Sequence, residues 1–121
     1  MASILVLDDV MDAAILVQRI LEKKGHVVHV FSDEDQSLVF VRENRVDLAI
    51  VDMKLRKMEG IEVMAEIKKL RPEIQVILMT GFPTRESAAK AMKLGAFAYC
   101  IKPVDKEDLE KTVARALADT R

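Results

Sequence analysis

The sequence predicts an α/β protein, a doubly wound parallel sheet of five strands with a helix after each strand. Short apolar runs alternate with longer segments of helical apolar spacing along the 121 residues. Four of the five runs do not alternate with polar residues, which is typical of strands covered by helices on both faces. Successive parallel strands joined by right-handed crossovers give the doubly wound arrangement.

The first two strand and helix pairs occupy the N-terminal part of the chain. Residues 4–7 form the first predicted strand, and apolar residues at i, i+3, i+4, i+7 and i+8 over residues 13–21 predict a one-sided helix. Gly25 is expected to cap that helix at its C-terminal end. Residues 26–31 are more polar than the other runs and suit an edge strand, and residues 38–41 indicate a shorter helix.

The remaining pairs repeat this pattern. Three further apolar runs are predicted to be interior strands: residues 48–51, 76–79 and 99–101. Three further segments have helical spacing: residues 63–70, 86–94 and 109–117. Pro72 is expected to stop the first of these helices. The second, residues 86–94, has mostly small apolar residues and is expected to pack more loosely than the others.

Length, charge and cysteine content restrict the function classes. The length indicates one domain over residues 1–121, and we predict no output domain in this chain. Nineteen basic and twenty acidic residues give a net charge of −1, which implies no bulk attraction to nucleic acid or an anionic membrane. No apolar stretch approaches the roughly 18 residues of a membrane span, and no signal peptide is predicted. Cys100, the only cysteine, is expected to be a core thiol and suits a reducing, cytoplasmic location.

Polar residues stand directly after four of the predicted strands: Asp8 with Asp9, Asp52, Thr80, and Lys102. Parallel strands end at one edge of a sheet, where open α/β folds bind ligands, so these side chains are expected to converge. Carboxylates within roughly 4 Å repel by about 4 kcal/mol per pair at an effective dielectric constant of about 20, so the cluster implies a cation. Oxygen ligands without a nearby histidine or cysteine favour Mg²⁺ or Mn²⁺ over zinc.

Each of these residues also has a purely structural explanation. The Asp8 and Asp9 pair could be a solvated loop or a helix cap. Lys102 could extend its ammonium to solvent along apolar neighbours, and Thr80 could cap a helix, a role that Thr84 could equally fill. Opposite a carboxylate cluster, however, an ammonium can hold both a carboxylate and an incoming phosphoryl oxygen. The set as a whole therefore points to phosphoryl chemistry.

The sequence resembles the receiver domain of two-component response regulators. The resemblance rests on the order of four motifs along the chain: the acidic pair, Asp52, Thr80 with Gly81, and Lys102 with Pro103. The resemblance covers the whole chain. It implies a flavodoxin-like fold with strand order 2-1-3-4-5. It also implies that Asp52 is the phosphoacceptor, which takes a phosphoryl group from a sensor histidine kinase, a phosphotransfer protein or a small phosphodonor.

The same resemblance assigns roles to the other residues. The implied ligands of Mg²⁺, or of Mn²⁺, are Asp9 and Asp52 directly, Asp8 through a water molecule, and the backbone carbonyl of Lys54. The metal, Lys102 and Thr80 would stabilise charge on the transferring group. Thr80 would then move toward the phosphoryl group and Tyr99 would rotate inward, which changes the surface around residues 86–94, the fifth strand and the last helix. Tyr99 could instead be a half-buried ring with its hydroxyl in water.

The loop after Asp52 departs from the common pattern. Many receivers have a proline four residues after the phosphoacceptor, where this chain has Arg56. This loop is either a solvated basic segment or a more mobile one in which Lys54 or Arg56 contacts the phosphoryl group or an acidic partner. Phe82 could shield the acyl phosphate from water. The bond before Pro103 could adopt either isomer.

The principal interpretation is a phosphorylation-controlled signalling module that acts on itself and is not an enzyme with an external substrate. A phosphatase with an aspartate nucleophile needs a second acid two residues further on, but Val10 and Lys54 occupy those positions. A nucleotide-binding switch lacks its glycine-rich phosphate loop. A receiver-like scaffold that binds without phosphorylation stays open. The implied partners are the phosphodonor, a downstream output domain or protein, and, on phosphorylation, a second copy of the chain.

Overall fold

The computed structural model of the protein describes residues 1–119; residues 120 and 121, which the predicted domain includes, lie outside the described part. Five strands and five helices alternate along the chain: β1 (Ser3–Leu7), α1 (Met11–Glu22), β2 (Val27–Phe31), α2 (Glu34–Glu43), β3 (Leu48–Asp52), α3 (Gly60–Leu70), β4 (Gln75–Thr80), α4 (Arg85–Lys93), β5 (Ala98–Ile101) and α5 (Lys106–Ala118). The strands are parallel and lie in the order β2-β1-β3-β4-β5. The predicted flavodoxin-like fold is confirmed.

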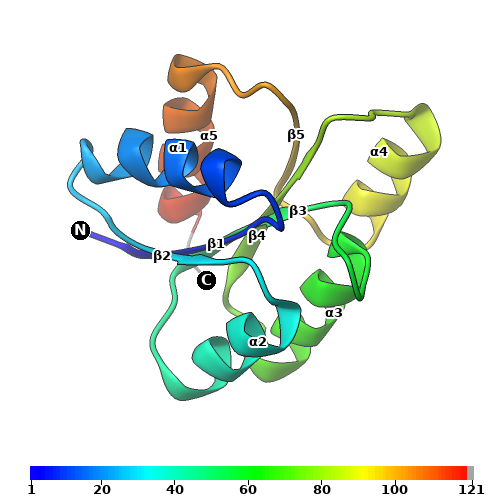
Figure 1. The fold of residues 1–121 in the computed structure, drawn as a ribbon, viewed down its shortest axis with the longest axis horizontal. Helices are drawn as coiled ribbons and strands as arrows, with labels where there is room; N and C mark the ends of the chain where they lie inside the picture. The colour runs from blue at the N-terminus through cyan, green and yellow to red at the C-terminus, as the bar shows by residue number, and fades with distance from the viewer. Residues whose placement is uncertain (120–121) are drawn as a thin grey trace.

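The helices form two layers on opposite faces of the sheet (Figure 1). One face packs against α1 and α5, and the other packs against α2, α3 and α4. Because successive side chains of a strand point to opposite faces, Ile4 and Val6 belong to the first core and Leu5 and Leu7 to the second. All four are fully buried. This burial on both faces explains why the runs of β1, β3 and β4 lack polar alternation.

β2 and β5 are the two edge strands of the sheet. The edge position of β2 agrees with its polar sequence, and the predicted strand order already placed β5 at the other edge. The expectation of an interior β5, taken from its apolar run, was wrong. β5 has a neighbour on one side only, and Ile101 is 56% exposed. α4 lies nearby but buries only Ala91, in agreement with the looser packing expected of its small residues.

Three local features refine the sequence prediction. Gly25 has φ +89°, a left-handed backbone that favours glycine, and lies two residues after the C-cap Lys23 of α1. Leu16 shares the helical spacing of the core residues but is 52% exposed, because α1 turns Ala14 toward the sheet instead. Cys100 is half-buried in the edge strand and packs against the core beneath α1 and α5, so the predicted core thiol lies at the margin of that core; burial raises the pKa of this thiol.

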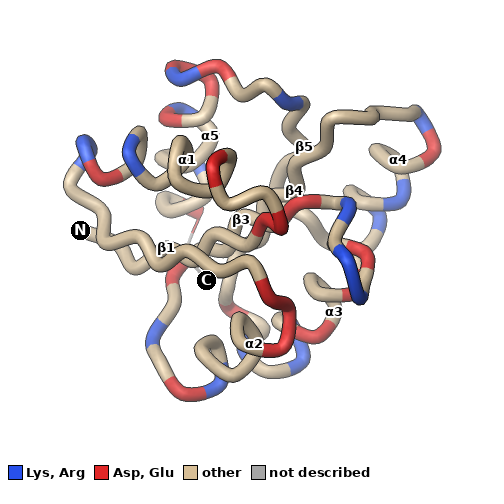
Figure 2. Tube along the Cα trace, in the orientation of Figure 1, with Lys and Arg blue, Asp and Glu red and all other residues tan. Residues whose placement is uncertain are grey.

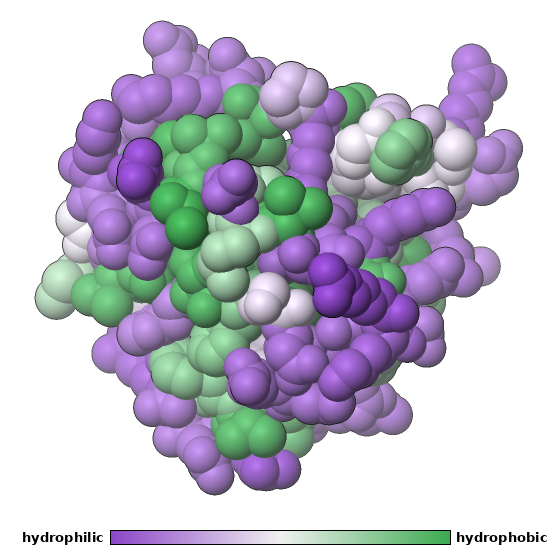
Figure 3. Space-filling view, in the orientation of Figure 1, coloured by the Kyte–Doolittle hydropathy of each residue, from purple (hydrophilic) through white to green (hydrophobic). Residues whose placement is uncertain are grey.

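The surface is mixed in polarity, with apolar side chains gathered near α1 in the view of Figure 3. Val10, Met11 and Leu16 are among the exposed large hydrophobic residues. Within residues 1–119, no helix combines the length and the apolar character needed to cross a lipid bilayer.

Candidate functional site

The polar residues that follow the strands meet at one edge of the sheet. Asp52 is the last residue of β3, beside Met79 of β4, and Thr80 is the last residue of β4, beside Ile101 of β5. Asp8 directly follows β1. Figure 2 shows the acidic ends of β1 and β3 close together, with a basic segment continuing from the end of β3. The strand order therefore brings polar side chains from the ends of four strands to one edge of the sheet.

The three aspartates form a tight cluster. Carboxylate oxygens of Asp8, Asp9 and Asp52 all lie within 4.8 Å of one another. Asp8 is 0% exposed, Asp52 is 6% exposed, and Asp9 is the most accessible of the three. Burial, followed by the negative charge of Asp8, raises the pKa of Asp52, although Lys102 opposes the shift. Further positive charge at the cluster would therefore favour the ionised form of Asp52.

Lys102 supplies one positive charge to this cluster. Its Nζ donates to Asp8 Oδ2 at 2.6 Å and lies 3.2 Å from Asp52 Oδ2. Burial disfavours the charged ammonium, but its hydrogen bond to Asp8 and the charges of Asp8 and Asp52 outweigh that cost and raise the pKa of Lys102. The Lys102 N–H donates to the Thr80 carbonyl at 2.7 Å, which fixes the backbone there. The Lys102–Pro103 bond is cis.

The donor set of the cluster fits a hard divalent cation. One ammonium against three carboxylates leaves excess negative charge, and all the available donors are oxygen atoms, as Mg²⁺ and Mn²⁺ prefer. Both oxygens of Asp8 already have partners, since Oδ1 accepts the Val10 N–H at 2.9 Å and Oδ2 accepts from Lys102. The partners of Asp52 are more distant, at 3.4 Å for the Lys54 N–H and 3.2 Å for Lys102 Nζ, and Asp9 is more accessible, so Asp9 and Asp52 are better placed than Asp8 to bind a cation directly.

Thr80 is buried beside this cluster and is 3% exposed. Its Oγ1 accepts the Phe82 N–H at 3.0 Å, within the turn that leads to α4. The N-cap of α4 is Thr84, whose side chain accepts the Ser87 N–H. The helix-cap explanation of Thr80 is therefore wrong, and its hydroxyl remains at the strand end.

Tyr99 has a partner that sequence analysis missed. The Tyr99 hydroxyl lies 2.6 Å from Ser87 Oγ, and either atom can donate. Ser87 also closes the capping box of α4 with Thr84. The Tyr99 ring is half-buried, as the alternative explanation held, but its hydroxyl has a protein partner, so Tyr99 links β5 to the first turn of α4. The sequence contains no signal for this pair beyond a serine three residues after a threonine.

The loop after Asp52 is more constrained than the absence of a proline suggests. The Met53 N–H donates to the Met79 carbonyl at 2.7 Å, and the Lys54 N–H donates to Asp52 Oδ1 at 3.4 Å. Gly60 lies against the backbone here, since a Cβ at this position would be 2.3 Å from the Asp52 carbonyl oxygen. Lys54 Nζ lies 5.7 Å from the centre of the Phe82 ring, and both residues line a pocket with Thr80.

An apolar groove of about 330 Å³ reaches the site from the α1 side. Its lining is almost entirely apolar apart from Lys102: Ala13, Leu16, Val17, Met79, Pro103 and Val104. Exposed apolar surface beside a charged site is typical of a contact surface for another protein.

Comparison with known proteins gives consistent results. The family model described as the response regulator receiver domain matches residues 4–114. The transcriptional regulatory protein ZraR of Salmonella typhimurium is 39% identical over 118 residues, 98% of this chain but 27% of the relative. The sporulation initiation phosphotransferase F of Bacillus subtilis is 31% identical and matches 94% of this chain and 92% of its own. A receiver domain structure from Clostridium thermocellum has a TM-score of 0.91 and 37% identity, covering 98% of this chain and 95% of its own.

Proposed function

Because this chain belongs to the response regulator receiver domain family, we propose that it is a phosphorylation-controlled signalling module with Asp52 as phosphoacceptor. The observation that carries the proposal is the convergence of Asp8, Asp9, Asp52 and Lys102 at one sheet edge. Of these residues, Asp52 ends the central strand, and its Oδ2 lies within 3.2 Å of Lys102 Nζ.

The proposed reaction transfers a phosphoryl group to Asp52. A carboxylate oxygen of Asp52 attacks phosphorus, a new O–P bond forms, and the P–N bond of a phosphohistidine breaks. The leaving imidazole takes up a proton, and the product is an acyl phosphate on Asp52. With acetyl phosphate as donor, a P–O bond breaks and acetate leaves.

The residues around Asp52 have separate roles in this proposal. Lys102 stabilises the charge of the transferring oxygens while staying paired with Asp8. Thr80 offers its hydroxyl to the phosphoryl group once its bond with the Phe82 N–H is released. Asp9, Asp52 and the Lys54 carbonyl would hold Mg²⁺ or Mn²⁺ directly and Asp8 through water, and the bound ion would neutralise charge on the phosphoryl oxygens.

The proposed signal leaves the site through Thr80 and Tyr99. When Thr80 moves toward the phosphoryl group, the space it leaves admits the Tyr99 ring, which then gives up its bond to Ser87. The first turn of α4 loses that contact, and the surface of α4, β5 and α5 changes. α4 is suited to such a shift because it buries only Ala91.

The proposed partners follow from the same surfaces. The phosphodonor protein rests on the apolar groove beside Lys102, which brings its phosphohistidine to Asp52. The chain spans 27% of the length of ZraR, a transcriptional regulatory protein, so a downstream output domain or protein is part of the proposal. We propose that the module lies in the cytoplasm and contacts neither nucleic acid nor a membrane directly. Dimerisation on phosphorylation stays a prediction, which sizing of both forms tests.

The decisive experiment is incubation of the chain with acetyl phosphate and Mg²⁺, followed by intact mass spectrometry. We expect one added phosphoryl group, which Asp52→Asn and EDTA abolish. Asp47→Asn is the matched control, since Asp47 lies at the opposite end of β3 and pairs with Arg45. Absence of the adduct, or an adduct that survives Asp52→Asn, would contradict the proposal.

A further inference from the structure

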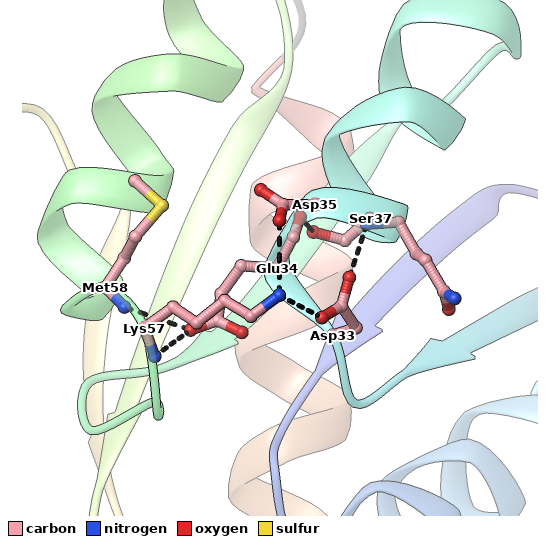
Figure 4. A network of polar contacts seen from close by, with 7 residues as sticks. Asp33, Glu34, Asp35, Ser37, Lys57 and Met58 are labelled. Carbon is pink, nitrogen blue, oxygen red and sulfur yellow. Dashed lines mark hydrogen bonds and ion pairs between the residues drawn. The ribbon is translucent and has the colours of Figure 1, made fainter.

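A buried acid at the start of α2 binds the loop that follows Asp52. Glu34 is the first residue of α2 and is 2% exposed. Its Oε2 accepts the backbone N–H groups of Lys57, at 2.6 Å, and Met58, at 3.0 Å. Figure 4 shows both bonds crossing from the α2 end to the loop. A single carboxylate oxygen thus holds two consecutive amides of the loop between β3 and α3.

The side chain of Lys57 makes a second link between the same segments. Its Nζ lies 2.9 Å from Asp33 Oδ1 and 3.2 Å from Asp35 Oδ2 (Figure 4). The Lys57 and Asp35 side chains are 57% and 72% exposed, so this ion pair is screened by solvent. The Glu34 bonds are buried and charge-assisted, so they contribute more to holding the loop.

The surroundings of Glu34 keep its carboxylate ionised. Burial alone would favour the neutral acid. The backbone N–H groups of Glu34 itself, Lys57 and Met58 outweigh burial and lower the pKa of Glu34 below its ordinary value of 4.5. At neutral pH the loop is therefore held by a full negative charge at the N-terminus of a helix, where such a charge is stabilised.

Glu34 holds the tip of the loop between β3 and α3. The base of the loop is closed by the Gly60 N–H, which donates to the Met53 carbonyl at 2.9 Å, and by a bridge between Lys54 and Glu59. Lys57 and Met58 lie at the tip, where Glu34 binds both backbone amides. Arg56 stands at a position where a proline would stiffen the chain, so here rigidity comes from a contact with α2.

We propose that Glu34 is a positioning residue for phosphoryl transfer. Glu34 restrains the tip of the closed loop whose base holds Lys54. The Lys54 N–H donates to Asp52 Oδ1, and the Lys54 carbonyl is a proposed ligand of the metal. Glu34 touches none of the reacting atoms and acts through the loop. This inference rests on the proposed function, since it concerns the geometry of the same site.

The test compares three substitutions with two matched controls. Glu34→Ala removes the oxygen that accepts both bonds, whereas Glu34→Gln keeps an amide oxygen that can accept the same N–H groups without charge. Lys57→Ala removes the outer ion pair but leaves the Lys57 backbone amide in place. Glu43→Ala and Glu43→Gln repeat the Glu34 changes at the other end of α2, where Glu43 is an exposed residue 4.0 Å from Arg42.

Binding of Mn²⁺ alone, followed by electron paramagnetic resonance, gives the first readout. We expect Glu34→Ala to weaken Mn²⁺ binding roughly tenfold, as is typical when a group supporting a metal ligand is removed. Glu34→Gln should recover part of this loss, and the Glu43 variants should bind as the unaltered protein does. Lys57→Ala should have a smaller effect than Glu34→Ala.

Two further readouts separate positioning from a purely structural role. In ¹H–¹⁵N spectra the Lys57 and Met58 amide protons should lie downfield in the unaltered protein and move upfield in Glu34→Ala. With acetyl phosphate, the rate defect of Glu34→Ala should be largest at low Mg²⁺ and shrink as Mg²⁺ is raised. A urea titration of each variant confirms that it is folded under these conditions, and Glu34→Gln carries the comparison if Glu34→Ala does not fold.

Unchanged Mn²⁺ affinity and unchanged amide signals in the Glu34 variants would overturn the inference. The same losses in the Glu43 variants would overturn it too, because the effect would then belong to α2 in general. If the unaltered protein takes no phosphoryl group at all, the proposed function fails, while Mn²⁺ affinity and the amide signals still decide whether Glu34 positions the loop.

Discussion

The hydroxyl of Tyr99 lies 2.6 Å from the Oγ of Ser87, so β5 and the first turn of α4 share one hydrogen bond. Ser87 therefore has two roles: it bonds to Tyr99, and at position N3 of α4 it forms the capping box with the N-cap Thr84. In the proposed switch, inward rotation of Tyr99 breaks this bond, so the bond stabilises the unphosphorylated form.

Removing the Tyr99 hydroxyl should therefore move the unphosphorylated domain toward its switched form. A single hydrogen bond contributes about 1 kcal/mol, so Tyr99→Phe should raise the switched population roughly fivefold. Amide chemical shifts of β5 and α4 in the unphosphorylated variant should move toward those of the acetyl phosphate-treated protein. Ser87→Ala should move the same shifts. Thr84→Ala removes the helix cap but spares Tyr99, so it should leave the chemical shifts of β5 unchanged. Equal changes in all three variants would exclude a specific role for the hydrogen bond between Tyr99 and Ser87.

Lys102→Ala tests the balance of charge in the acid cluster. Asp8 is fully buried and would lose its ammonium partner, so we expect the free energy of unfolding to fall by roughly 3 kcal/mol without Mg²⁺ while the domain stays folded. Added Mg²⁺ should stabilise the variant more than the unaltered protein, because the site has lost the positive charge of Lys102 and its net charge is more negative. Phosphorylation by acetyl phosphate should be slower.

The control for that change is Lys106→Ala, which removes a more exposed lysine paired with Glu110 at 3.3 Å. This substitution should alter neither Mg²⁺ dependence nor phosphorylation. A fully active Lys102→Ala protein would remove the lysine from the mechanism.

The sequence predicted the fold well because its main signals are local. Apolar runs, uninterrupted in all strands but β2, and helical spacing mark the strands and helices, and parallel topology brings Asp8, Asp52, Thr80 and Lys102 to one edge. The roles of these residues stay predictions. The interior placement of β5 failed because an apolar run gives no information about how many neighbours a strand has.

The contacts of Glu34 and Ser87 could not be predicted in the same way. Glu34 binds backbone amides 23 and 24 positions further along the chain, and backbone amides leave no trace in side-chain identity. Glu34 stands between two other acids and is indistinguishable from a solvated helix start. Ser87 is explained by helix capping alone, so its second partner, Tyr99, becomes visible only in three dimensions.

Gly60→Ala should disturb the backbone of the phosphoacceptor. The added methyl group would lie 2.3 Å from the Asp52 carbonyl oxygen and 2.8 Å from Met53 Cα, so the backbone must shift. We expect a loss of about 1–3 kcal/mol in the free energy of unfolding and slower phosphorylation. Gly81→Ala is the matched control, because a Cβ there meets no atom within 4 Å. Equal stability of the two variants in urea titrations would contradict the role of close packing at Gly60.

Phe82 offers a test of water access to the acyl phosphate. Phe82 is 75% exposed, its ring centre lies 5.7 Å from Lys54 Nζ, and it lines one pocket with Lys54 and Thr80. Phe82→Ala should shorten the lifetime of phosphorylated Asp52, measured as loss of the added mass after the phosphodonor is removed. Phe82→Leu keeps apolar bulk and should preserve more of the lifetime. An unchanged or longer lifetime in Phe82→Ala would refute shielding.

The ionised state of Glu34 predicts a specific pH dependence of stability. Because folding lowers the pKa of Glu34, the folded state binds its proton less readily than the unfolded state does. The resulting stability is fully present above the ordinary value of 4.5 and is lost as pH falls through the lowered pKa of the folded state. The unaltered protein should therefore exceed Glu34→Gln in stability at neutral pH, and this advantage should shrink in acid.

Urea titrations of both proteins from pH 7 down to about pH 3 measure that difference. The pKa of Asp33 is also lowered, chiefly by its hydrogen bond to Lys57, and its charge repels that of Glu34, so the difference between the two proteins reports Glu34 together with its coupling to Asp33. Glu43→Gln, at the exposed end of α2, serves as the control for removing a carboxylate outside the loop contact. If the advantage over Glu34→Gln is constant with pH, the carboxylate does not hold the loop through its charge, and shape alone must explain the contact.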